Sequence, residues 1–99
     1  MKTQSYKDLV VWQKGIAQMR RAAVSIPSNL AEGQARHTTG EFVQFISHAE
    51  GSVAELDTQL ILSVELRFCD SRSAAPAFEL IDELRRMLNG LRRKLVARQ

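Results

Sequence analysis

Thr38-Thr-Gly-Glu-Phe-Val-Gln-Phe-Ile-Ser47 begins the stretch of sequence that decides the fold. Thr38 and Glu41 have the spacing of a capping box, in which the two side chains satisfy free backbone N–H groups at a helix N-terminus. Apolar residues then recur in steps of three and four, which predicts one face of a long amphipathic helix over 38–69. The apolar positions of this stripe are Phe42, Phe45, Ile46, Ala49, Val53, Leu56, Leu60 and Val64.

A second apolar stripe of the same kind follows a polar turn at 70–76. Its members are Phe78, Ile81, Leu84, Leu88, Leu91 and Leu95. We expect Ser73 to cap this helix and Pro76 to lie in its first turn, where a missing N–H costs little. Because a short loop joins two long amphipathic helices, the sequence predicts an antiparallel hairpin.

The N-terminal third predicts two shorter helices. Gly15 is expected to interrupt the first, and the second runs over 17–32 with Pro27 inside it and Gly33 as its C-cap. Two short pieces cannot cover the apolar stripes of two long helices. An uncovered apolar stripe favours association, so we expect either a homo-oligomer or missing chain that would cover the stripe.

Composition bounds the kind of protein. The chain has 99 residues, 44% of them hydrophobic and 25% charged, which is typical of one globular domain over 1–99. Cys69 is the only cysteine, so no disulfide can form within the chain and a reducing compartment fits best. No apolar run approaches the roughly 20 residues that span a bilayer, and the first residues lack the apolar segment of a secretory signal. We therefore expect a cytoplasmic protein without membrane contact.

The positive charge is unevenly distributed. The formal net charge is +3, and no acidic residue follows Glu83, whereas six cationic residues do. These cations either form a surface for RNA or another anion, or favour the negative end of a helix dipole. The candidate nucleic-acid or anion contacts are Arg20, Arg85, Arg86, Arg92, Arg93, Lys94 and Arg98.

Catalytic, cofactor-binding and metal-binding patterns find little support in the sequence. Glu41, His48 and Glu55 are spaced by seven residues, so they share one helix face but lie about two turns apart, too far for one ion. A polar helix face is the favoured interpretation. Arg21, Glu32 and Glu55 are a candidate structural polar cluster, which would set helix register more than stability if it were buried. We expect no enzyme, no cofactor and no small-molecule substrate.

Several stretches together carry a recognisable pattern. They are 6–14, Met19-Arg-Arg-Ala-Ala-Val-Ser-Ile-Pro-Ser-Asn-Leu-Ala-Glu-Gly33, 41–47, 51–60 and 87–91. The pattern closely resembles the four-helix-bundle proteins encoded in intervening sequences of bacterial 23S rRNA genes. The resemblance implies an up-down-up-down bundle, assembly into rings of five bundles (a pentamer), no enzymatic activity and an association with RNA.

The chain departs from that family in one place. Between Lys14 and Gly15, about twenty residues that continue the first helix and loop back in the family are missing relative to the pattern. We therefore expect an all-α, antiparallel up-down-up-down four-helix bundle whose first helix is short or incomplete. The favoured function is a non-enzymatic, self-associating bundle that serves as an RNA-associated accessory or scaffold. The alternatives are a partner-binding helical module without nucleic-acid contact, and a bundle that binds a metal or ligand through His48 with Glu55 or Glu41.

Overall fold

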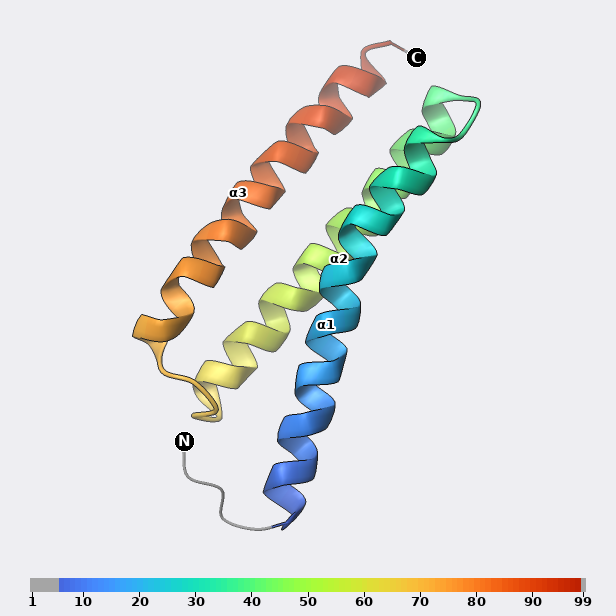
Figure 1. The fold of residues 1–99 in the computed structure, drawn as a ribbon. Coiled ribbons are helices and arrows are strands. Elements are labelled where there is room, and N and C mark those ends of the chain that lie inside the picture. The colour runs from blue at the N-terminus through green and yellow to red at the C-terminus, as the bar shows by residue number, and fades with distance from the viewer. Residues whose placement is uncertain (1–5, 99) are drawn as a thin grey trace.

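Three α-helices form the described part of the chain. The computed structural model describes residues 6–98, with the side chains of residues 10, 11 and 13–98. The helices are α1 (Tyr6–Gln34), α2 (Thr39–Glu65) and α3 (Ser71–Val96). As Figure 1 shows, α2 lies between α1 and α3, and α3 returns toward the end at which α1 and α2 are joined. The expected all-α antiparallel hairpin of α2 and α3 is confirmed.

The predicted four-helix bundle is wrong, because residues 6–34 form one helix rather than two. α1 continues through Gly15 and Pro27 without a break. A glycine inside a helix costs only about 1 kcal/mol relative to alanine, which packing against a neighbouring helix can offset. The predicted break at Gly15 is therefore absent, and the expected topology loses one helix and one turn.

Polar side chains around Pro27 connect α1 to α2. The side-chain amide of Asn29 donates hydrogen bonds to the carbonyl oxygen of Ser25 at 2.8 Å and to its hydroxyl at 2.9 Å. The Ser25 hydroxyl in turn shares a 2.7 Å hydrogen bond with the hydroxyl of Ser52 on α2. The turn that contains the proline is therefore held by its own side chains and by the neighbouring helix.

Gly33 does not end α1 in the way that its sequence position suggests. The helix continues to Gln34, and no described glycine has a positive φ, so the predicted C-cap is wrong. Gly33 is buried where α1 meets the start of α2. A Cβ at this position would lie 2.8 Å from Cδ1 of Phe42 and 2.8 Å from Cβ of Phe45, so close packing explains the glycine.

The ends of the other helices are defined by side chains and one unusual backbone conformation. The Thr38 hydroxyl accepts a hydrogen bond from the Glu41 N–H at 3.1 Å, as the capping spacing predicts. The cap of α3 is Asp70, whose carboxylate accepts from the Ser73 N–H at 2.7 Å, so the assignment of Ser73 as the cap is wrong. Between the two helices, Arg67 has a φ of 63°, in the left-handed region.

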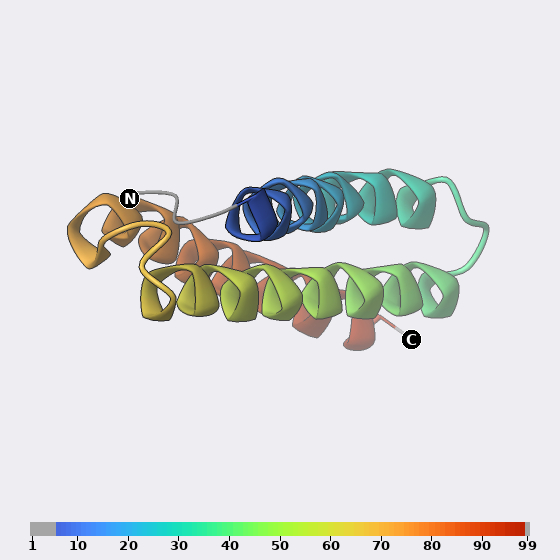
Figure 2. The ribbon, with the colours of Figure 1, turned by 90° about the horizontal axis from the view of Figure 1, so that it is seen from below.

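The described helices make an open arrangement rather than a closed bundle. α1 and α3 each pack against α2, but no Cα of α1 comes within 8 Å of a Cα of α3 in the described residues. The Cα atoms extend over 54 × 23 × 13 Å, and Figure 2 shows α1 stacked above α2 with α3 beside it. The core consists of Ile26, Ile46, Ala49, Val53, Leu60, Ala74, Ile81, Leu88 and Leu95. None of the helices, as far as they are described, combines the length and apolar character needed to cross a bilayer.

Candidate interaction surface

The buried residues of α3 form one line along the helix. Ala74, Ile81, Leu88 and Leu95 are buried and follow one another at intervals of seven residues. Because seven residues are close to two helical turns, these side chains lie on the same face, which packs on α2. On one side of this line, arginines of α3 form ion pairs with α2, and on the other side the residues are apolar.

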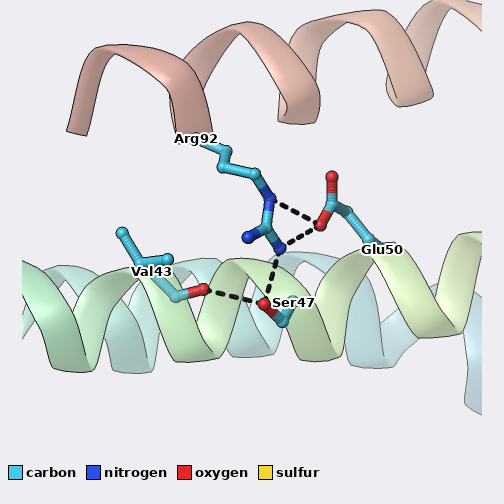
Figure 3. Close-up of polar contacts among 4 residues, drawn as sticks. All are labelled: Val43, Ser47, Glu50 and Arg92. Atoms are coloured by element: carbon cyan, nitrogen blue, oxygen red, sulfur yellow. Dashed lines mark hydrogen bonds and ion pairs between the residues drawn. The ribbon is translucent and has the colours of Figure 1, made fainter. Parts of the chain in front are cut away.

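One flank of the line is closed by ion pairs to α2. Arg92 lies four residues after Leu88, and its Nε donates to Oε1 of Glu50 at 3.0 Å. Its Nη2 donates to the same carboxylate oxygen and to the Ser47 hydroxyl, as Figure 3 shows. The Ser47 hydroxyl donates a hydrogen bond to the carbonyl oxygen of Val43 at 3.2 Å. Since the Arg92 and Glu50 side chains are 30% and 31% exposed, water screens this pair only partly.

A second ion pair repeats the pattern one heptad earlier. Arg85 lies four residues after Ile81, and its Nη2 is 3.0 Å from Oδ2 of Asp57 on α2. Asp82, on α3 itself, lies 4.0 Å from Nη1 of the same guanidinium. Two arginines of α3 therefore connect to two carboxylates of α2 along a single seam.

The contacts of α2 show on which side of α3 this seam lies. Glu50 and Asp57 lie four residues after the buried Ile46 and Val53, whereas Ser52, which contacts α1, lies three residues after the buried Ala49. Positions three and four residues beyond a buried line are on opposite flanks of a helix. The ion pairs therefore lie on the side of α3 that faces away from α1, and the other flank of α3 faces the side of α1.

That other flank is apolar and lacks a cover within the described chain. Each of its inner positions lies three residues after a residue of the buried line, and the outer positions lie three residues further on. We call this set the open flank, and it consists of Ala77, Leu80, Leu84, Met87 and Leu91. The three inner residues are half-buried, but Leu80 is 60% exposed and Met87 is 61% exposed. Within the residues described, this is a continuous apolar strip along α3.

The candidate anion contacts are divided by the structure into two groups. Arg85 and Arg92 are held in ion pairs with α2. The others have exposed side chains, and no carboxylate of the described residues pairs with them. These exposed candidates are Arg20, Arg86, Arg93, Lys94 and Arg98. The last three lie together at the C-terminal end of α3.

The candidate polar cluster is not assembled in the structure. Arg21, Glu32 and Glu55 are all exposed, and no ion pair joins them within the described residues. Glu55 instead accepts a 3.3 Å hydrogen bond from Gln59. His48 packs edge-on against Phe45, with 5.9 Å between the ring centroids. In the part of the chain that is described, no three His, Cys, Asp or Glu side chains are grouped so that they could hold a metal ion.

Two features of this surface escaped the sequence analysis, although the sequence contains a signal for each. Glu50 and Asp57 are seven residues apart on one helix, as Arg85 and Arg92 are on the other, which is the spacing that two antiparallel helices need for repeated ion pairs. Leu80 and Met87 share the heptad interval of the buried residues but fall outside the predicted stripe. Both signals become clear only when the partner helix is known.

Comparison with known proteins supports the resemblance drawn from the sequence. A family model described as 23S rRNA-intervening sequence protein matches residues 14–90. The match begins at Lys14 and ends at Gly90. No curated protein matches the chain.

Proposed function

The chain belongs to the 23S rRNA-intervening sequence protein family, and we propose that it is a non-enzymatic helical scaffold that works as an assembly of its own copies. The observation that carries this proposal is the open flank of α3, which no described part of the chain covers. A scaffold needs a surface for assembly rather than a reactive site, and the exposed apolar residues of this flank would suit that purpose.

The energetic argument rests on the two most exposed residues of the open flank. Leu80 and Met87 are 60% and 61% exposed, although they lie in line with the half-buried Leu84 and Leu91. Complete burial of one such side chain is worth about 1.5–3 kcal/mol. A neighbour that covers the strip would gain part of this free energy at each of the two exposed residues, and continuous apolar strips of this kind mark interaction sites.

Sedimentation equilibrium of the full chain tests self-association. We expect a mass above that of the 11.2 kDa monomer at micromolar concentration. Met87→Glu places a charge on the open flank and should shift the mass toward the monomer. Val24→Glu is the matched control, because Val24 is equally exposed at 63% but lies on α1. A parent protein that stays monomeric at micromolar concentration would contradict the proposal.

RNA contact is a second candidate function, favoured by the exposed cations at the end of α3. Arg85 and Arg92 are engaged with α2. The exposed candidates that remain in this region are Arg86 and a group of three at and just beyond the C-terminal end of α3, namely Arg93, Lys94 and Arg98. The family description names a 23S rRNA gene element, which is consistent with RNA as the anionic partner. Phosphate contacts of this type need no base recognition, so affinity would depend strongly on salt.

Fluorescence anisotropy with a labelled uridine oligonucleotide tests this second candidate. Replacement of Arg93, Lys94 and Arg98 by alanine should weaken binding and reduce the slope of log K against log salt by about 2, at about 0.7 per lost phosphate contact on a single strand. Arg67→Ala combined with Arg72→Ala removes exposed cations near the opposite end of α3 and serves as the control. Equal affinity of the parent and the triple variant would rule out this surface.

A further inference from the structure

We propose that the occupant of the open flank is the beginning of α1 from a second copy, residues 6–14, which we call the projecting segment. This inference rests on the proposed self-association and adds the two surfaces that meet. Because these surfaces differ, each copy uses its projecting segment on one neighbour and its open flank on another. Copies joined in this way form a ring when the rotation between neighbours closes.

The projecting segment lies past the end of α2. Gly15 and Met19 of α1 line one pocket with Leu62 and Ser63, near the C-terminal end of α2, and the Ser63 hydroxyl lies 3.9 Å from Sδ of Met19. The nine residues of α1 that precede Gly15 make about 13 Å of helix at 1.5 Å per residue. Figure 1 shows the first turns of α1 extending beyond the last turn of α2.

This position leaves apolar surface of the segment without a cover in the described chain. Val11 lies eleven residues before Ala22, close to three helical turns, so the two share one face of α1. Ala22 is 4% exposed, whereas Val11 is 53% exposed. The face is buried where α2 runs beside it and open where α2 has ended.

The segment cannot turn back onto the open flank of its own chain. α1 is one continuous helix over Tyr6–Gln34, so the segment keeps the direction of the rest of α1. Along the described residues, no Cα of α1 comes within 8 Å of a Cα of α3. Contact between these two apolar surfaces therefore needs a second copy.

Charge selects the part of the open flank on which the segment docks. The segment carries two lysines and one aspartate, a formal charge of +1. Residues 71–84 of α3 carry three carboxylates and one arginine, whereas residues 85–98 carry six cations and no carboxylate. Glu83 borders the flank between Leu80 and Met87, and it is exposed and without an ion-pair partner among the described residues. A cationic segment is therefore attracted to the part of the flank beside Glu83 and repelled from its C-terminal end.

The lengths of the two surfaces agree with this placement. Leu80 and Met87 are seven residues apart, which is about 10 Å along α3. The projecting segment, at about 13 Å, is long enough to cover both of these residues, which are the most exposed of the flank. The contact would bury apolar surface on both copies at the same time.

Complementation between two full-length variants tests the contact by sedimentation equilibrium. Val11→Glu damages the segment and Met87→Glu damages the flank, so each alone should raise the dissociation constant about tenfold or more. An equimolar mixture should form a heterodimer of twice 11.2 kDa, because one variant keeps an intact segment and the other an intact flank. Val24→Glu, at a position of α1 that is 63% exposed, should assemble like the parent. Circular dichroism verifies that every variant retains its helices.

Disulfide trapping in a Cys69→Ser background gives a second readout. Val11→Cys mixed with Leu84→Cys should cross-link, because each position lies near the middle of its surface in either direction of the segment. Val24→Cys mixed with Leu84→Cys should not cross-link.

Three results separate this inference from the proposed self-association. Assembly of Val11→Glu like the parent would overturn the inference, and so would a mixture of Val11→Glu and Met87→Glu that stays monomeric. A disulfide-linked dimer of Leu84→Cys alone would show that two flanks pair with each other, and would also overturn it. In all three cases the proposed self-association stands, whereas a monomeric parent would remove both.

Discussion

Gly33 of α1 lies so close to Phe45 of α2 that a Cβ on the glycine would be 2.8 Å from the Cβ of the phenylalanine. The Cβ of Phe45 is attached directly to the backbone, so rotation of the ring cannot relieve such a contact. The two helices therefore approach closely here because one of them has no side chain. This contact fixes the spacing of α1 and α2 just before the connection that joins them (Figure 1).

Gly33→Ala should destabilise the protein by about 1–2 kcal/mol. Overpacking of a close contact costs about 1–3 kcal/mol, and the better helix propensity of alanine offsets up to about 1 kcal/mol of that cost. Gly51→Ala is the control, since no atom lies within 4 Å of its missing Cβ, and this variant should gain about 0.5–1 kcal/mol. Urea unfolding measures both changes. The same sign for the two variants would contradict the close contact.

Arg92→Ala should lower the free energy of unfolding by about 1 kcal/mol. The variant loses hydrogen bonds to Glu50 and Ser47. Because the pair is half-buried, the small stabilisation that exposed ion pairs give is a lower limit for its contribution. Arg93→Ala changes the adjacent, exposed residue and should alter stability by less than about 0.5 kcal/mol. Thermal unfolding in low salt compares them, and equal losses would indicate that the ion pair contributes nothing.

Arg67→Gly should stabilise the protein by about 0.5–1 kcal/mol. Arg67 has a φ of 63°, and the N–H groups of Arg67 and Phe68 bond to the carbonyls of Val64 and Ser63, which closes the end of α2. A left-handed conformation costs a non-glycine residue about 1–2 kcal/mol, part of which the greater freedom of glycine in the unfolded chain cancels. Arg72→Gly, inside α3, should instead destabilise the protein. A loss of stability in Arg67→Gly, measured by urea unfolding, would exclude strain at this turn.

Acid should weaken the cap of α3. The backbone N–H of Ser73, followed by the Ser73 hydroxyl, donates to the Asp70 carboxylate and holds its pKa below the ordinary value. A carboxylate with a lowered pKa in the folded state contributes stability above its unfolded pKa of about 3.9, and that contribution is lost as the pH falls through the folded pKa. The melting temperature should therefore fall more steeply below about pH 4 in the parent than in Asp70→Asn, which keeps a capping side chain that does not titrate. An equal fall of the melting temperature in the two proteins at acid pH would contradict this assignment.

Local sequence patterns predicted the two long helices well. Thr38 begins α2 as expected, because capping depends on side chains within one turn of the helix end. The cap of α3 is Asp70 rather than the predicted Ser73, since both residue types suit the position and only the backbone decides between them. The predicted break at Gly15 is wrong because helix propensity alone takes no account of the packing of α1 on α2.

The surface was less predictable than the helices. The basic residues of α3 look alike in the sequence, yet Arg85 and Arg92 face carboxylates of α2 while Arg93 and Lys94 face solvent. That division follows from which flank of the helix meets the neighbouring helix. The charges of α3 alone could not show which arginines are paired, because their partners on α2 lie 28 and 42 positions away in the sequence.

The sequence by itself determined that the chain is helical, that α2 and α3 form an antiparallel hairpin, and that it belongs with the 23S rRNA-intervening sequence proteins. These properties depend on residues within a few turns of one another, where periodicity and capping act. Only the tertiary structure decided that residues 6–34 are one helix, and that α3 closes one flank with ion pairs and leaves the other open. Those outcomes depend on packing between helices, in which a local cost of about 1 kcal/mol at Gly15 is outweighed by contacts that no local pattern contains.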